Sequence, residues 1–293
     1  MDVVVFGAGS LGSLLGGLLA RTHDVTLVGR RPHVDRIREQ GLRVSGAIET
    51  TVGPDARTDV PPSADLALVT VKAYDTPAAA RALADTSLDC ALSLQNGLGN
   101  ERTLADALDA PVLAGTCTYG ARLTGPGEVA CTGVGEVVLG AREGGPSPVA
   151  ERVGRAFDEA DVVTRVADDM PRRLWEKLAV NAGINAPTAL ARVQNGALLG
   201  HDAGDVMRAA AREVAAAARA DGVELTDETA VAAVERVADA TADNRSSMLQ
   251  DVEKGRRTEV DSINGVVDGP DAPVNQTLTA LLRAWERERG LRR

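Results

Sequence analysis

Cysteine and histidine are scarce in this chain of 293 residues, which contains three of each. Cys90, Cys117 and Cys131 show no C-x-x-C spacing and the histidines are scattered, so we predict neither a disulfide framework nor a metal site. No apolar run reaches the roughly 18 residues that span a bilayer. No basic segment followed by an apolar stretch opens the sequence. We therefore expect a cytoplasmic protein without a membrane segment.

Positive charge is also in deficit. Lysine and arginine number 32 against 42 aspartates and glutamates, which gives a net charge of −10. Such a charge disfavours nucleic acids and anionic membranes as partners. Because the chain is 44% hydrophobic and 25% charged, its composition is that of a globular protein, and small molecules are its expected partners.

Among arginine, lysine, aspartate and glutamate, lysine is by far the rarest in this chain. It occurs only at Lys72, Lys177 and Lys254, against 29 arginines. Lysine carries a compact ammonium, whereas arginine carries a planar guanidinium, and the two are not interchangeable in a site. A position that keeps lysine in such a chain is therefore a candidate for a specific chemical role.

The first half of the chain alternates short β-branched runs with helical stretches, which is typical of βα units in a parallel sheet. After these units we expect antiparallel strands within residues 116–140, a helix over Pro148–Glu159 and a last strand over Val162–Val166. The earlier strands are expected at Asp2–Phe6, Asp24–Val28, Leu66–Val71, Cys90–Leu94 and Val112–Thr118.

From about Asp168 onward, strand signals fade and the sequence becomes rich in alanine, leucine and arginine. Helical periodicity is clear over Ala203–Ala220 and Thr229–Ala242. We therefore predict an α/β protein with two domains. A Rossmann-like dinucleotide-binding domain spans residues 1–167, and an all-helical domain spans residues 168–293.

A glycine-rich motif follows the first expected strand and opens a helix from Ser10 to about Ala20. In this G-x-G-x-x-G context, Gly7 allows the tight turn, Gly9 lets the backbone approach a pyrophosphate, and Gly12 permits close packing. The phosphates would lie at the positive N-terminus of the helix. The motif consists of Gly7, Ala8, Gly9, Ser10, Leu11 and Gly12.

The end of the second strand indicates the type of cofactor. An acidic residue there would bind the ribose 2′-hydroxyl of NAD, but this chain has Arg30 and Arg31. Guanidinium groups bind phosphate through paired, charge-assisted hydrogen bonds, which favours the 2′-phosphate of NADP. A solvated surface pair is the alternative, and Arg30 is the stronger candidate.

Two later strand ends carry polar residues at the edge where open α/β sheets bind ligands. Lys72 follows the strand Leu66–Val71 and is a candidate for the cofactor site. Asn96 follows the strand Cys90–Leu94 and offers an amide to cofactor or substrate. Since Asn-Gly is also an ordinary turn, spacing alone leaves the role of Asn96 open.

Lys177, Asn181 and Asn185 are spaced four residues apart. This spacing places one ammonium and two amides along one side of a helix. A solvated polar face is the alternative, but the retained lysine favours a site. Pro187 is expected to end or kink the helix, and Asn195 should follow on a loop.

A second polar stretch, residues 244–265, contains serines, acids and amides. We expect two consecutive helical segments here, suited to the wall of a polar pocket, although ordinary capping and surface residues would look the same. Spacing cannot choose between Glu259 and Asp261 as the functional acid.

Eight blocks of the sequence, spread in a fixed order over nearly the whole chain, resemble the ketopantoate reductase (2-dehydropantoate 2-reductase) family. The resemblance implies NADPH-dependent reduction of 2-dehydropantoate to pantoate, a step toward pantothenate and coenzyme A. It also implies a helical domain like that of 6-phosphogluconate dehydrogenase. The blocks are GAGSLG, VKAYD, LQNGLG, GTCTYGAR, LWEKLAVNAGINAPTAL, NRSSMLQD, RRTEVDSING and APVN.

The resemblance assigns roles to individual residues. Lys177 corresponds to the proton donor and Glu259 to the acid of the site, which also lies near the cofactor. The substrate-binding residues would be Asn96, Asn181, Asn185, Asn195 and Ser247. Asn96 would also touch the cofactor, together with the glycine motif, Arg30, Lys72 and Ala121.

The chain departs from the family in two places, and it leaves rival interpretations. Only VVDGPDA separates Gly265 from Pro273, a shorter segment than the family has, so the last helices and any homodimer contact they form are expected to differ from those of the family. The GTCTYGAR block has Cys117 and Tyr119 where the family often has threonine and histidine. The nearest rival is a reductase of another 2-oxo acid, or a β-hydroxyacid dehydrogenase, on the same scaffold. A cofactor-binding sensor would be expected to lose Lys177 or Glu259, and both are present.

Overall fold

The computed structural model describes residues 1–292, with the side chain of residue 201 left aside. The chain divides into two compact units, each described here by itself. The first comprises Met1–Gln95 and Gly99–Met170, and the second comprises Asn96–Leu98 and Pro171–Arg293. The three-residue segment 96–98, expected from sequence within the first domain, therefore belongs to the second unit.

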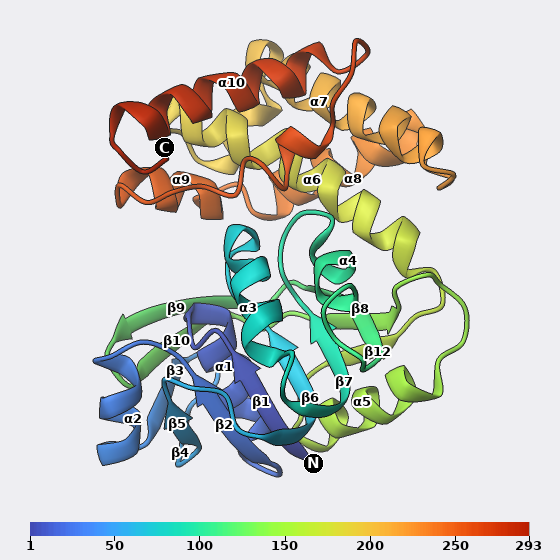
Figure 1. Ribbon diagram of the computed structural model, residues 1–293. Coiled ribbons are helices and arrows are strands. Elements are labelled where there is room, and N and C mark those ends of the chain that lie inside the picture. The colour runs from blue at the N-terminus through green and yellow to red at the C-terminus, as the bar shows by residue number, and fades with distance from the viewer. Residues whose placement is uncertain (293) are drawn as a thin grey trace. The chain divides into compact units, whose positions relative to one another are not determined.

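An eight-stranded sheet forms the centre of the first unit, in the order β12-β11-β8-β7-β6-β1-β2-β5 (Figure 1). All neighbouring strands run parallel except β8 and β11, which are antiparallel. Its strands are β1 (Asp2–Phe6), β2 (Asp24–Val28), β5 (Asp55–Arg57), β6 (Ser63–Val69), β7 (Ser87–Ser93), β8 (Val112–Cys117), β11 (Val137–Ala141) and β12 (Thr164–Val166).

The central strands are buried on both faces, as their continuous apolar sequences predict. Val3, Val4 and Val5 of β1 are at most 1% exposed. β1 lies between β2 and β6, so its carboxyl end, and the glycine motif that follows it, meet the carboxyl ends of both neighbours. This parallel arrangement confirms the Rossmann-like prediction.

A second, four-stranded sheet has the order β4-β3-β10-β9. Helix α1 contacts strands of both sheets, so its leucines Leu14, Leu15, Leu18 and Leu19 are all fully buried. The strands are β3 (Leu42–Gly46), β4 (Thr50–Val52), β9 (Gly120–Gly125) and β10 (Glu128–Gly133). The antiparallel pairing of β9 with β10 was expected, whereas β3, β4 and β5 were not predicted.

The helices of the first unit cover its sheets. In α5, the hydroxyl of Ser147 accepts a hydrogen bond from the Ala150 N–H at 3.2 Å, and Pro148 begins the helix. Both features favour a helix start at this position. The helices are α1 (Ser10–Leu19), α2 (His33–Gln40), η1 (Ala73–Asp75), α3 (Thr76–Leu83), α4 (Asn100–Ala105) and α5 (Pro148–Glu159).

Within the described residues, the second unit is built from helices and turns (Figure 1). Its apolar core includes Trp175, Leu178 and Ile184 from α6, and α7 packs against α8 and α10. The elements are α6 (Met170–Ala191), η2 (Asn195–Leu199), α7 (His201–Ala220), α8 (Asp227–Ala240), α9 (Ser247–Glu253), η3 (Asn264–Val266) and α10 (Pro273–Glu288).

Two local predictions for this unit need correction. Of the two outcomes expected at Pro187, an end or a kink of the helix, the first does not occur, because α6 continues to Ala191. Every residue from 182 to 189 is buried, so tertiary packing outweighs the hydrogen bond that proline cannot donate. The stretch 256–265 is not a second helix after α9. Gly255 has a φ of +61°, which ends the helical path, and turns and η3 follow.

Candidate active site

The glycine motif forms the turn between β1 and α1. The N–H groups of Gly7 and Ala8 both donate to the Val28 carbonyl, at 3.0 and 2.9 Å, and Thr70 donates its hydroxyl hydrogen bond to the Gly7 carbonyl. Gly7 has a φ of +112°, which L side chains rarely adopt. The turn is therefore fixed by neighbouring strand ends.

Space beside Gly9 suits a phosphate group. A methyl group built on Gly9 would meet no atom closer than 3.9 Å, and no side chain caps the N-terminus of α1. The first N–H groups of a helix lack partners within the helix and attract anions. The turn thus fits a dinucleotide pyrophosphate. Ser10 is already engaged, because its hydroxyl accepts a hydrogen bond from the Leu123 N–H at 3.1 Å.

Arg30 and Arg31 lie between β2 and α2. The Arg30 side chain is 91% exposed and lies 3.7 Å from the Asp75 carboxylate, while Arg31 lies 3.5 Å from Asp35. Such exposed, weakly held guanidiniums are able to turn toward a phosphate. The structure thus provides two exposed cations at this strand end.

Lys72 and Ala121 lie in the same unit as the glycine motif. Lys72 is half-buried, follows β6 in extended conformation and precedes η1. Ala121 lies on β9, paired with Cys131 of β10. All residues assigned to the cofactor alone, the glycine motif included, therefore belong to the first unit.

The predicted row of polar residues lies on one helix of the second unit. Lys177 and Asn181 are half-buried and Asn185 is 6% exposed, all within α6. The Nδ2 atom of Asn181 is buried and has no hydrogen-bond partner among the described residues. Because a buried donor without a partner is costly, this amide suits an acceptor oxygen on a ligand.

The two serines at the start of α9 have different surroundings. Ser246 is buried, accepts the Leu249 N–H at 3.1 Å, and shares a hydrogen bond with Thr188 of α6 at 2.7 Å. Ser246 therefore caps α9 and connects it to α6 at Thr188, which is three residues after Asn185. Ser247 is exposed, which leaves the second serine as the one available to a ligand.

Asn195 is tied to the chain segment that leads into α9. Its backbone N–H donates to the Asn244 carbonyl at 3.0 Å, and its Nδ2 donates to the Thr241 hydroxyl at 2.9 Å. Its Oδ1 is buried without a partner among residues 1–292. The amide oxygen is thus available as an acceptor.

The segment carrying Glu259 contacts both α6 and the 96–98 segment. Asn264 donates to the Ala182 carbonyl of α6 at 3.1 Å, and the Leu98 N–H donates to the Ser262 carbonyl at 3.1 Å. Hydrogen bonds thus link the segments that carry the predicted substrate residues to α6, either directly, as for Asn264 and Ser246, or through a neighbouring segment, as for Asn195.

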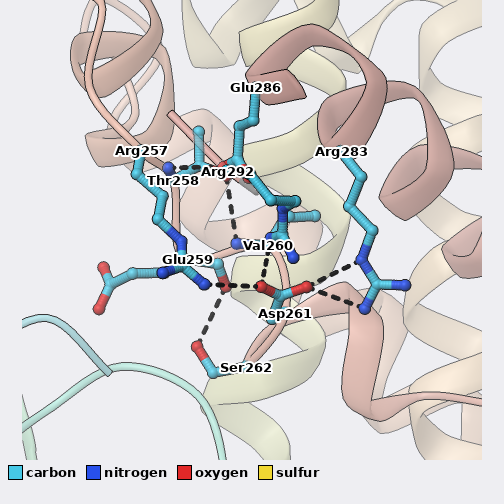
Figure 2. A network of polar contacts seen from close by, with 9 residues as sticks. All are labelled: Arg257, Thr258, Glu259, Val260, Asp261, Ser262, Arg283, Glu286 and Arg292. Atoms are coloured by element: carbon cyan, nitrogen blue, oxygen red, sulfur yellow. Dashed lines mark hydrogen bonds and ion pairs between the residues drawn. The ribbon is translucent and has the colours of Figure 1, made fainter. Parts of the chain in front are cut away.

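Glu259 and Asp261 have different surroundings. Asp261 lies against Arg257, Arg283 and Arg292. Burial raises the pKa of Asp261, but hydrogen bonds from Arg292 and Arg283 outweigh burial and hold the pKa below its ordinary value. Figure 2 shows the Glu259 carboxylate at the left of the view and Arg283 at the right, with Asp261 between them. The geometry thus separates a structural acid, Asp261, from Glu259, which is 5% exposed.

A buried polar cluster that sequence reasoning missed precedes Asn96. Gln95 donates to the Val71 carbonyl at 3.1 Å and to the Thr76 hydroxyl at 2.6 Å, and Thr76 donates to Asn100 at 2.8 Å. These contacts bind the end of β7 to the segment around Lys72. The sequence signal that could have predicted this cluster is the occurrence of polar residues directly after an apolar strand.

Two kinds of feature are absent from the described residues. No helix of residues 1–292 is long and apolar enough to cross a membrane. In the same part of the chain, no group of three or more histidine, cysteine, aspartate or glutamate residues is arranged to hold a metal ion.

A parallel sheet with a glycine-rich turn, joined to a helical unit that presents a lysine and amides, defines a two-domain oxidoreductase of the dinucleotide-binding class. Family models narrow this class. The model described as "Ketopantoate reductase PanE/ApbA" matches residues 3–144, and that described as "Ketopantoate reductase PanE/ApbA C terminal" matches residues 169–286. The chain therefore belongs to the ketopantoate reductase family.

Individual relatives agree with the family models. The chain is 45% identical to the 2-dehydropantoate 2-reductase of Halobacterium salinarum, over 98% of this chain and 100% of the relative. It is 40% identical to that of Archaeoglobus fulgidus, over 97% of each chain. The family-level resemblance predicted from the sequence blocks is thus confirmed.

Solved structures show the same fold. A PanE/ApbA family ketopantoate reductase from Ralstonia eutropha superposes with a TM-score of 0.90 at 35% identity, covering 99% of this chain and 100% of the other. D-mandelate dehydrogenase, solved with NADH and anilino(oxo)acetate, also gives a TM-score of 0.90, at 25% identity and full coverage of both chains. The two-part α/β and helical fold class is confirmed.

Proposed function

We propose that this protein reduces 2-dehydropantoate to pantoate with a hydride from NADPH, a step toward pantothenate and coenzyme A. The observation that carries the proposal is the row Lys177, Asn181 and Asn185 on α6, in a chain of the ketopantoate reductase family. In this proposal residues 1–167 bind NADPH and residues 168–293 hold the small-molecule substrate. The protein acts in the cytoplasm, either as a monomer or as a homodimer.

The mechanism assigns the proton to Lys177. NADPH, when bound by the first unit, would supply a hydride to the carbonyl carbon. The C=O π electrons move onto oxygen, and the Lys177 ammonium donates a proton to it, which gives the alcohol and a neutral amine. The ammonium also stabilises the negative charge that develops on oxygen before the proton moves. Solvent then returns the proton to the amine.

The remaining residues hold the substrate in place. The unpartnered Asn181 Nδ2 would donate to a substrate oxygen, and the unpartnered Asn195 Oδ1 would accept from the substrate hydroxyl. Asn96, Asn185 and Ser247 add further donors, and Glu259 orients Lys177 or keeps it charged. Fixing the ketone in this way lowers the entropic part of the barrier.

The cofactor proposal rests on the fit of the first unit to a phosphorylated dinucleotide. The N-terminus of α1 beside Gly9 would hold the pyrophosphate, and Arg30 would bind the 2′-phosphate. Lys72, Ala121, Asn96 and Glu259 would complete the cofactor contacts.

The Arg30 assignment has a direct test with a matched control. Hydrogen bonds to charged groups contribute about 1.5–3 kcal/mol, so Arg30→Ala is expected to raise the KM for NADPH about 10- to 100-fold. The KM for NADH should change little because NADH lacks the 2′-phosphate. Arg31→Ala is the control, and steady-state kinetics with both cofactors is the measurement. A larger NADPH effect for Arg31→Ala would transfer the role to Arg31.

A second candidate is reduction of another 2-oxo acid. The likeness to D-mandelate dehydrogenase favours it, because mandelate is the 2-hydroxy acid of an aromatic 2-oxo acid. Lys177 and the amides of α6 would serve that reaction equally well, since the chemistry at the ketone is the same.

The test is NADPH oxidation, followed by nicotinamide absorbance, with 2-dehydropantoate, pyruvate, 2-oxoisovalerate and benzoylformate as substrates. NADH is the cofactor control, and the assay is run in low and high salt because an acidic surface repels itself in dilute buffer. Selective turnover of 2-dehydropantoate supports the proposal. Preferential turnover of another 2-oxo acid would replace it with the second candidate.

A further inference from the structure

The turn that carries Glu259 is held from both sides by α10 and the residues that follow it. Before Glu259, Thr258 donates both its N–H and its hydroxyl to the Glu286 Oε1, at 2.8 and 2.6 Å. After Glu259, the Asp261 carboxylate accepts from the Arg283 Nε at 2.8 Å. Figure 2 shows these contacts.

Arg292 binds both Glu286 and Asp261, the two acids that hold the turn. Its Nε donates to the Glu286 Oε2 at 2.8 Å, and its Nη2 donates to the Asp261 Oδ2. The Arg292 side chain is only 15% exposed and Glu286 is fully buried. A buried carboxylate needs such partners, because an unpaired charge in the interior is costly. One guanidinium therefore binds both acids that fix the Glu259 turn.

Local sequence explains how Arg292 reaches this position. After α10, the Leu291 N–H donates to the Glu286 carbonyl at 2.9 Å and the Gly290 N–H donates to the Arg287 carbonyl at 3.0 Å. Gly290 has a φ of +65°. This is the Schellman pattern of helix ends, which reverses the chain and returns Arg292 to the side of α10.

The turn itself leaves little freedom to Glu259. Its carbonyl accepts the Ser262 N–H and the Ile263 N–H, each at 3.1 Å, and the Ser262 hydroxyl at 3.1 Å. The Ser262 carbonyl in turn accepts the Leu98 N–H. A shift of the 258–261 backbone would thus move both Glu259 and the segment that carries Asn96.

We infer that Arg292 is a positioning residue for the reaction, acting through Glu286 and Asp261 to hold the turn that carries Glu259. The inference rests on the proposed function, because it requires Glu259 to serve turnover. It assigns to the residues after α10 a part in catalysis that involves no contact with substrate or cofactor.

The experiment is a double-mutant cycle of Arg292→Ala and Glu259→Gln, measured with the 2-oxo acid that the wild-type protein reduces best. Displacing a catalytic group by about 1 Å costs up to about 10²-fold, so Arg292→Ala should lower kcat about 10- to 100-fold. NADPH affinity should fall less than kcat, because the residues assigned to the pyrophosphate and the 2′-phosphate lie in the other unit. In the Glu259→Gln background Arg292→Ala should lower kcat hardly further, because the two act as one unit. Arg292→Lys should restore part of the loss. Arg287→Ala is the matched control and should be neutral, because Arg287 is an exposed arginine of α10.

Thr258→Val provides a second route if Arg292→Ala fails to fold. It removes the hydrogen bond from the Thr258 hydroxyl to Glu286 and keeps the shape of the side chain. The fall in kcat that it causes should likewise disappear in the Glu259→Gln background. Losses that multiply in the double variants, or Arg292→Ala activity equal to the Arg287→Ala control, would overturn the inference and leave the proposed function intact. A folded, NADPH-bound wild-type protein that reduces no 2-oxo acid would overturn both.

Discussion

Replacing Lys177 by alanine is expected to lower kcat for 2-dehydropantoate by about 10²–10⁴-fold, the usual contribution of a general acid. Affinity for NADPH should stay close to that of the wild type, because the residues assigned to the pyrophosphate and the 2′-phosphate lie in the other unit of the fold. Single-turnover kinetics measures the chemical step, and quenching of protein fluorescence measures cofactor binding.

Two further lysine variants make this result specific. Lys254→Ala removes the exposed lysine at the end of α9 and should leave turnover unchanged. Lys177→Arg keeps a positive charge but offers a guanidinium, whose pKa is far higher than that of an ammonium and which therefore donates its proton poorly. Its kcat should lie between those of wild type and Lys177→Ala. Full activity in Lys177→Ala would exclude this residue as the proton donor.

Alanine at Gly9 and alanine at Gly12 are expected to fail in different ways. A methyl group on Gly9 meets no protein atom within 3.9 Å, so Gly9→Ala should keep its melting temperature. It would, however, occupy the space in which the backbone approaches the pyrophosphate, and should weaken NADPH binding about ten-fold or more.

A methyl group on Gly12 would collide with the Gly7 carbonyl oxygen and the Thr70 hydroxyl. Overpacking costs about 1–3 kcal/mol, which corresponds to a fall in Tm of roughly 2–4 °C per kcal/mol for a domain of this size. Differential scanning fluorimetry with and without NADPH separates the two effects. Unchanged NADPH affinity in Gly9→Ala would mean that the space beside Gly9 is not a ligand site.

Sequence periodicity predicted the elements whose side chains are buried in a regular pattern. β1, β2 and α5 have the predicted bounds, because continuous apolar runs and a Ser-Pro helix start leave little choice. The small strands β3, β4 and β5 escaped prediction. β4 and β5 have three residues each, too few for a periodic signal, and every residue of β4 is at least partly exposed.

The candidate site was predictable to a different extent. Helical spacing alone placed Lys177, Asn181 and Asn185 on one helix. Spacing could not choose between Glu259 and Asp261, because the arginines that engage Asp261 from α10 and beyond lie 22 and 31 residues away in sequence. The roles of all these residues in turnover stay predictions until the variants are measured.

The segment Asn96–Leu98 belongs to the second unit although both of its neighbours in sequence belong to the first. A chimaera that takes its helical unit from another member of the family by a single crossover near Met170 would therefore combine a native 96–98 segment with a foreign partner for the Leu98 N–H. The exchangeable module of this fold is discontinuous, made of residues 96–98 together with residues 171–293. Recombination or gene-fusion designs should transfer both pieces together.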